Sequence, residues 1–243
     1  MKLRYAGALY DRTLALYTGE VRPEGVELDY TVGHPNQIFR RMLASAEFDV
    51  SEMSAANYLC AVARGDRRFV AIPVFPSRVF RHGSLFVNAA AGITAPADLR
   101  GRRLGVPEYA QTANVWVRAL LQHEYGVRPE EIHWVRGSTE KIDFTLPPGV
   151  RVDDAPPGSD LSAMLEAGEI DALAAPEKPA SFLAGSPRVR RLFPNFAEVE
   201  ADYYRRTGHF PIMHLVVLQR ALYEAERTLP RRLYAAFEAA KQR

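Results

Sequence analysis

The residues with the clearest chemical character lie together between positions 72 and 82. Two prolines interrupt an apolar stretch there, which then ends in four polar residues. These are Ser77, Arg78, Arg81 and His82. Because proline cannot donate to a sheet ladder, we expect the chain to leave its sheet near Pro73 and Pro76. Guanidinium groups suit bidentate binding of carboxylate, and imidazole exchanges protons near neutral pH. The segment therefore predicts a small anionic substrate and proton transfer.

Polar residues at other strand ends extend this prediction, since ligands of open α/β sheets bind beyond the carboxyl ends of the strands. The further candidates are Asp11, Arg12, Glu52, Ser54, Glu108, Tyr109, Thr112 and His214. Most candidates also have a structural alternative. Asp11 and Arg12 are compatible with a solvated turn, Glu52 with a capping segment, Ser54 and Thr112 with helix caps, and His214 with a core histidine. Arg78 and Arg81 are compatible with a surface role, and His82 with a structural histidine.

Other kinds of site find little support. His209 and His214 are five positions apart and have no cysteines nearby, which is not a zinc-binding pattern, so we predict no metal ligands. The chain has no phosphate-binding P-loop, because Gly101–Gly105 lacks the Lys–Ser/Thr that would follow. It also has no Gly-x-Ser-x-Gly elbow of a serine hydrolase.

Composition is that of an ordinary globular chain. The 243 residues are 47% hydrophobic and 25% charged, and the net charge of +2 argues against nucleic-acid or membrane binding. Cys60 is the only cysteine, so no intramolecular disulfide can form. The N-terminus lacks a signal-peptide pattern, and no window approaches the roughly 18 apolar residues of a membrane span. We therefore expect a cytoplasmic protein.

Strand and helix patterns alternate along the chain, which predicts an α/β fold with largely parallel sheets. Predicted strands cover residues 3–8, 26–32, 48–50, 69–74, 85–87, 104–106, 133–135, 150–153, 170–174 and 212–218. The clearest predicted helices cover 111–125, which Gly126 ends, and 161–167, which Asp160 caps and Gly168 ends. We predict two lobes, residues 1–85 with 200–243 and residues 86–199, with a ligand cleft between them.

Several of these segments resemble the 4,5-dihydroxyphthalate decarboxylases, a likeness that covers nearly the whole chain. The most specific segments are Ala71–His82 and Tyr203–His214, and others are Tyr10–Thr13, Phe48–Met53, Gly105–Tyr109 with Thr112 and Trp116, and Leu161–Ala172. The less specific segment Pro96–Val106 also occurs in type 2 periplasmic binding proteins, whose two-lobed fold the resemblance implies. Two features depart from the family. Its members usually continue several tens of residues beyond position 243, so we expect a shorter relative or a missing helical cover, and Ala175–Pro179 does not match.

The resemblance implies decarboxylation of 4,5-dihydroxyphthalate to protocatechuate, with a small aromatic dicarboxylate as partner. Arg78, Arg81 and Arg12 would bind carboxylate, with Asp11 beside them, and His82 or His214 would be the general acid or base. Glu52 or Glu108 would orient a histidine or accept from a hydroxyl, and Ser54, Tyr109 and Thr112 would bind the catechol oxygens.

Three questions stay open from the sequence. The aromatic ring of the substrate can act as its own electron sink, so no cofactor is required, although a divalent metal stays an alternative. The sequence also leaves open whether the protein forms a homo-oligomer. A solute-binding protein of an ABC-type importer would share the lobes and the anion-binding arginines without catalysis. A lyase of the same fold in another pathway, such as menaquinone biosynthesis, is a third interpretation.

Overall fold

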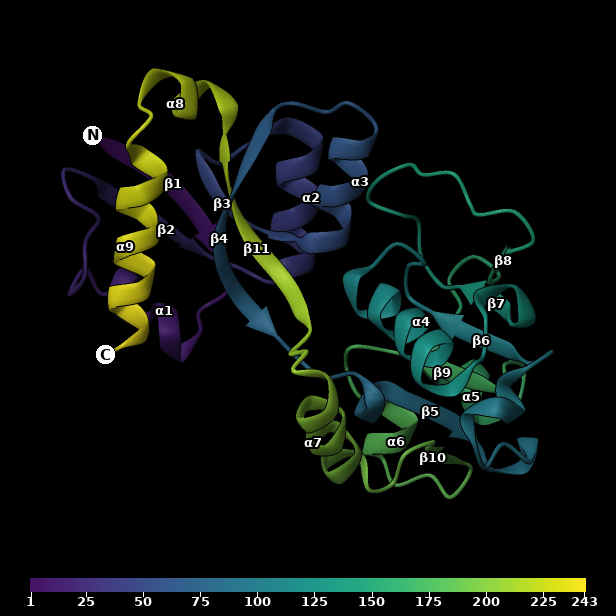
Figure 1. Cartoon of the computed structure of the whole chain (residues 1–243). Coiled ribbons are helices and arrows are strands. Elements are labelled where there is room, and N and C mark those ends of the chain that lie inside the picture. Colours follow the sequence, from purple (N-terminus) through teal and green to yellow (C-terminus); the bar gives the residue numbers. More distant parts are fainter. The chain divides into compact units, whose positions relative to one another are not determined.

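The structure is a computed structural model that describes residues 1–243. Contacts between residues divide it into two compact units (Figure 1). Unit 1 comprises Met1–Arg78 and Ile212–Arg243, and unit 2 comprises Val79–Pro211. No helix is long and apolar enough to cross a membrane.

Unit 1 is built on a five-stranded sheet with the order β2-β1-β3-β11-β4. Its strands are β1 (Lys2–Gly7), β2 (Glu27–Val32), β3 (Val50–Ser54), β4 (Phe69–Arg78) and β11 (Ile212–Gln219). β1 pairs in parallel with β2 and β3, whereas β11 is antiparallel to both β3 and β4. The sheet is therefore parallel except for the strand that follows the return of the chain from unit 2.

Helices cover both faces of this sheet. They are α1 (Asp11–Tyr17), α2 (Pro35–Ser45), α3 (Ala55–Ala63), α8 (Arg220–Ala225) and α9 (Leu229–Lys241). One hydrophobic core joins α1 and α9 to side chains such as Leu3 and Val216, and another joins α2 to alternate side chains such as Ala6 and Val217. This alternation is what a strand buried on both faces requires.

The structure corrects the prediction that the chain leaves the sheet at Pro73 and Pro76. β4 continues to Arg78, pairing Ser77 with His214 and Arg78 with Ile212. It is the edge strand, and residues 73–76 form a bulge opposite Leu215 alone. Both prolines lie in this bulge, where no ladder donor is needed, so the sheet tolerates them.

Unit 2 contains a six-stranded sheet with the order β10-β5-β9-β6-β7-β8. Its strands are β5 (Leu85–Asn88), β6 (Arg103–Val106), β7 (His133–Arg136), β8 (Arg151–Asp154), β9 (Ala172–Ala174) and β10 (Val189–Arg191). β5 is antiparallel to both of its neighbours, and the pairs among β9, β6, β7 and β8 are parallel. As in unit 1, the one reversed strand is the first after the chain enters the unit.

The helices of unit 2 match the local signals of the sequence. They are α4 (Thr112–Tyr125), α5 (Leu161–Ala167), α6 (Ala180–Leu183) and α7 (Phe196–Thr207), with single 3-10 turns at His82–Ser84, Ala89–Ala91, Pro96–Leu99 and Pro129–Glu131. Gly126 and Gly168 end α4 and α5 in the left-handed region, and the Asp160 side chain accepts from the Ser162 amide. These helix boundaries are as predicted.

The divide between the units lies elsewhere than the sequence places it. The first crossing falls at residues 78 and 79 and the second at 211 and 212, instead of near 85 and 200. The second difference arises because α7 packs on the turn His82–Ser84, where Glu200 accepts from the Gly83 amide at 3.0 Å. Helix α7 therefore belongs to unit 2.

Candidate functional site

Glu52 is the centre of a polar cluster in unit 1. It lies in β3 and is completely buried. Its Oε2 accepts from the Ala8 amide at 2.8 Å, and its Oε1 accepts both from the Tyr10 hydroxyl at 2.7 Å and from His214 Nδ1 at 2.6 Å. Three donors thus replace the water that a buried carboxylate loses. The sequence places Glu52 after its strand, whereas the structure places it within β3.

His214 lies in β11 with its imidazole fixed on two sides. Its strand neighbours are Ser54 of β3 and Ser77 of β4, and the ring of Phe39 in α2 packs edge-on against it at 4.9 Å. Glu52 engages Nδ1, and the His214 side chain is still 19% exposed. Since an ionised carboxylate only accepts, the pair holds the proton on Nδ1 and leaves Nε2 for proton exchange.

Arg12 is linked to the Glu52–His214 pair by Tyr10, which contacts both Arg12 and Glu52. Its guanidinium stands 4.1 Å from the centre of the Tyr10 ring, and Nη1 binds Asp11 at 3.0 Å. Its Nε donates to the carbonyl of Pro76, in the bulge of β4. Tyr10, the residue before α1, was not among the predicted site residues. Its position between the first strand and the polar residues Asp11 and Arg12 was the signal that could have found it.

The remaining predicted residues of unit 1 lie at the ends of β3 and β4 and at the start of α1. Ser54 is buried and caps α3 by accepting from the Asn57 amide, as predicted. Arg78 is exposed at the last position of β4, two residues beyond the carbonyl that binds Arg12. Asp11 is the first residue of α1 and its side chain is 90% exposed. Unit 1 therefore brings an acid–base pair and two arginines onto adjoining elements.

Glu108 lies in unit 2, in a second buried polar cluster. Its Oε1 pairs with Lys141, and both side chains are at most 5% exposed. The neighbouring carboxylate of Glu140 accepts from the amides of Tyr109 at 2.6 Å and Ala110 at 3.1 Å, just before α4, and its burial raises its pKa. Glu108 has Lys141 as its charge partner and does not orient a histidine here. Lys141 and Glu140 were missed because they lie about 30 residues away in sequence.

Tyr109 and Thr112 occupy packed positions in this cluster. The Tyr109 ring is 3% exposed, stacks on Phe144 and is covered by the Arg118 guanidinium at 3.7 Å. Thr112 is the first residue of α4 and is 5% exposed. Tyr109 therefore belongs to the core of unit 2, and its predicted contact with a catechol is not supported by its surroundings.

His82 and Arg81 are also buried in unit 2. His82 is 1% exposed, and the rings of Tyr125, Phe193 and Tyr203 stand edge-on around it. This burial lowers the pKa of His82 to about 4, so the ring is neutral at physiological pH. Arg81 is 6% exposed beside Glu200, and burial lowers its pKa to about 10. These surroundings favour structural roles for both residues and leave His214 as the candidate for proton transfer.

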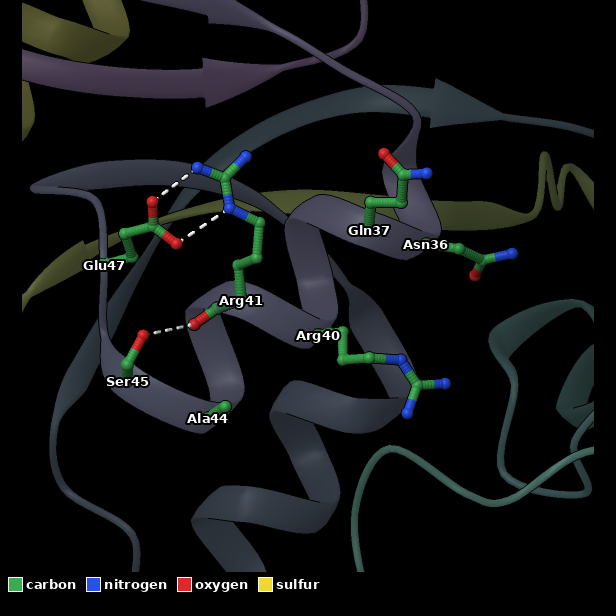
Figure 2. A pocket seen from close by; sticks show the side chains of 7 residues that line it. All are labelled: Asn36, Gln37, Arg40, Arg41, Ala44, Ser45 and Glu47. Atoms are coloured by element: carbon green, nitrogen blue, oxygen red, sulfur yellow. Dashed lines mark hydrogen bonds and ion pairs between the residues drawn. The ribbon is translucent and has the colours of Figure 1, made fainter.

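Two further features bear on ligands. No group of three or more His, Cys, Asp or Glu side chains is arranged to hold a metal ion. An open pocket of about 530 Å³ lies on α2 (Figure 2) and is lined by Asn36, Gln37, Arg40, Arg41, Ala44, Ser45 and Glu47. Arg41 is paired there with Glu47, and Figure 2 shows Arg40 pointing away from that pair. The pocket contains none of the predicted site residues and no acid–base pair, so we place the candidate site at Glu52 and His214.

The fold identifies a class of protein first. Residues 14–143 match the family model described as "ABC transporter, phosphonate, periplasmic substrate-binding protein". The periplasmic aliphatic sulphonate binding protein SsuA from Escherichia coli superposes with a TM-score of 0.60 at 17% identity, covering 99% of this chain and 72% of that one. The two-unit α/β architecture is therefore that of the periplasmic substrate-binding proteins, as predicted.

Sequence relatives then narrow the class. A 4,5-dihydroxyphthalate decarboxylase from Comamonas testosteroni is 42% identical over 99% of this chain and 75% of its own length. A second, from Pseudomonas putida, is 40% identical over 86% of this chain and 83% of its own length. The chain thus belongs to the 4,5-dihydroxyphthalate decarboxylases, a family of carboxy-lyases, which confirms the resemblance predicted from its motifs.

Proposed function

We propose that this protein decarboxylates 4,5-dihydroxyphthalate to protocatechuate, releasing CO2. The pairing of His214 with the buried Glu52 at 2.6 Å is the observation that carries the proposal. A solute-binding protein needs donors for its ligand, but it does not need an oriented imidazole with a free nitrogen. The names of the two decarboxylase relatives support the choice of substrate.

The substrate has a hydroxyl para to each carboxylate, so its ring can accept and return electrons. His214 Nε2 removes the phenolic proton, and the oxygen electrons move onto the ring carbon that bears the leaving carboxylate. That carbon takes up a proton, the bond to the carboxylate breaks, and its electron pair restores aromaticity as CO2 leaves. Reprotonation of the phenolate completes a reaction in which one proton replaces one CO2.

Binding of the second carboxylate falls to the arginines of unit 1. Arg12 donates from Nε to Pro76 and from Nη1 to Asp11, which leaves further N–H groups of the guanidinium for a ligand, and its side chain is 37% exposed. Arg78 extends from the nearby end of β4. The leaving carboxylate should stay away from both guanidiniums, because binding it tightly would stabilise the ground state more than the transition state.

The test is incubation of the purified protein with 4,5-dihydroxyphthalate, followed by chromatography for protocatechuate and measurement of CO2. We expect turnover by the wild-type protein and a loss of about 10²–10⁴-fold in His214→Gln, the range for removal of a general acid or base. Tight binding without any product would instead favour the importer-type solute-binding protein, which the family model over residues 14–143 also describes.

A further inference from the structure

Tyr10 contacts two parts of the candidate site in unit 1. Its hydroxyl donates to Glu52 Oε1, the same oxygen that accepts from His214 Nδ1. Its ring carries the guanidinium of Arg12 at 4.1 Å. One side chain therefore touches both the buried carboxylate of the acid–base pair and the arginine proposed to bind the substrate.

The hydroxyl contact fixes the direction of the Glu52 carboxylate. Burial, together with the charge of Glu52, raises the pKa of Tyr10, so the phenol stays protonated and acts as a donor. With Ala8 holding Oε2, the Tyr10 hydroxyl and His214 have to share Oε1. Loss of the hydroxyl would leave the imidazole as the only donor to that oxygen and would change the strength of its Nδ1–H bond.

The ring contact fixes the direction of Arg12. A guanidinium over an aromatic face is attracted by the ring quadrupole, and Arg12 has a second support at the Pro76 carbonyl. These two supports hold a long side chain that would otherwise lose entropy on binding an anion. The ring and the hydroxyl of Tyr10 thus have separable effects.

We propose that Tyr10 is a positioning residue, whose hydroxyl orients the Glu52–His214 pair and whose ring orients Arg12 for the substrate carboxylate. The proposal rests on the proposed function, because it expects loss of the hydroxyl to lower kcat for decarboxylation and loss of the ring to raise KM for the substrate. It makes Tyr10 the physical link between proton transfer and anion binding.

Tyr30 provides a matched control. It is a half-buried tyrosine of the same unit, and its hydroxyl donates to the Ala8 carbonyl at 2.9 Å and to Thr13 Oγ1 at 3.2 Å, not to Glu52. Tyr30→Phe therefore removes a phenol of similar burial that makes no hydrogen bond to Glu52 or His214. A purely structural role for Tyr10 predicts the same phenotype for both Tyr→Phe variants.

The kinetic experiment compares Tyr10→Phe, Tyr10→Leu and Tyr30→Phe with the wild-type protein. We expect Tyr10→Phe to lower kcat about tenfold or more with KM within about threefold, because it loses only the hydroxyl. Tyr10→Leu should lose kcat similarly and also raise KM about tenfold. Tyr30→Phe should keep both constants near wild type. Equal kcat for Tyr10→Phe and the wild type would overturn the role of the hydroxyl, and equal KM for Tyr10→Leu would overturn that of the ring.

A second readout separates this proposal from the proposed function. The His214 Nδ1 proton, identified by its loss in His214→Gln, is followed in the downfield region of the proton NMR spectrum. We expect it to move in Tyr10→Phe and to stay in place in Tyr30→Phe, whether or not the protein turns over 4,5-dihydroxyphthalate. An unmoved resonance in Tyr10→Phe would contradict the proposal even if the decarboxylation itself is established.

Discussion

Glu52 shows how a fully buried carboxylate is held without a cationic side chain. Its three donors are the backbone amide of Ala8 just after β1, the phenol of Tyr10 just before α1, and the imidazole of His214 in β11. None of these donors is a Lys or Arg, so no cationic side chain already neutralises the Glu52 carboxylate. Its negative charge can therefore stabilise a positive charge that develops on His214. This is the arrangement expected of a residue that stabilises an imidazolium during proton transfer.

Glu52→Gln tests this role at the scale of one residue. The amide replaces one accepting oxygen with an N–H₂ group that faces existing donors, so we expect a loss of about 10²-fold or more in kcat. We also expect a loss of about 1–3 kcal/mol in the free energy of unfolding, measured in urea. Glu47→Gln, which breaks a partly exposed pair with Arg41, is the control and should change both kcat and the free energy of unfolding little.

His82 and His214 illustrate that residue type alone does not decide a role. His82 lies among three aromatic rings, and its buried Nδ1 has no hydrogen-bond partner. His214 has a carboxylate on one nitrogen and remains partly accessible. We therefore expect His82→Leu to keep turnover within about threefold of wild type, measured in the same product assay, whereas His214→Gln loses it.

The lowered pKa of His82 also predicts a pH dependence of stability. The folded value is about 4 against an ordinary 6.5, so the unfolded chain binds more protons between these two values. Stability from this group is therefore present above pH 6.5 and lost as the pH falls toward 4, by about 2 kcal/mol between pH 7 and pH 5. Urea unfolding at both pH values should show this loss in the wild type and about 2 kcal/mol less of it in His82→Leu. An identical loss in both proteins would contradict the assigned pKa.

At the scale of elements, the bulge of β4 explains how two prolines help to build the site. Residues 73–76 leave the ladder, which frees the Pro76 carbonyl to accept from Arg12. The ladder then resumes, and Ser77 pairs with His214. The interruption of one edge strand thus brings an arginine from α1 toward the strand that carries the imidazole.

Helix α2 ends on a strained residue, which allows a clean stability test. Ala46 adopts φ 50° in the left-handed region, which costs an alanine about 1 kcal/mol. We expect Ala46→Gly to raise the free energy of unfolding by about 0.5–1 kcal/mol, measured in urea. Ala44→Gly, at an exposed helical position of α2, should lower it by about 1 kcal/mol. Destabilisation by Ala46→Gly would mean that the lost Cβ contact outweighs the relief of strain.

Elements with strong local signals could be predicted from the sequence, and those set by distant contacts could not. The boundaries at Gly126, Asp160 and Gly168 follow from capping chemistry that acts within one turn. Helix α1 was missed, because Asp11 and Arg12 resemble a polar turn when their packing on α9 is unknown. Glu52 or Glu108 was predicted to orient His82 or His214, but the sheet order is what decides which glutamate pairs with which histidine, because Glu52 and His214 lie 162 positions apart.

At the scale of the whole molecule, the two units follow one plan. Each has its own sheet with a single reversed strand and its own hydrophobic cores on both faces. The same architecture occurs in substrate-binding proteins such as SsuA, so the fold does not distinguish binding from catalysis. The distinction lies in the chemistry of the site. This chemistry can be tested by identifying the products formed from analogues of the substrate.

The analogue 4-hydroxyphthalate tests the role of the para hydroxyl, because its one hydroxyl is para to only one of its two carboxylates. Ring protonation assisted by that hydroxyl removes the para carboxylate and leaves 3-hydroxybenzoate. Loss of the other carboxylate would leave 4-hydroxybenzoate. We expect only 3-hydroxybenzoate, measured by chromatography against both standards, while phthalate, which has no hydroxyl, should bind and release no CO2. Formation of 4-hydroxybenzoate, or CO2 from phthalate, would contradict electron release from a para hydroxyl and with it the role assigned to His214.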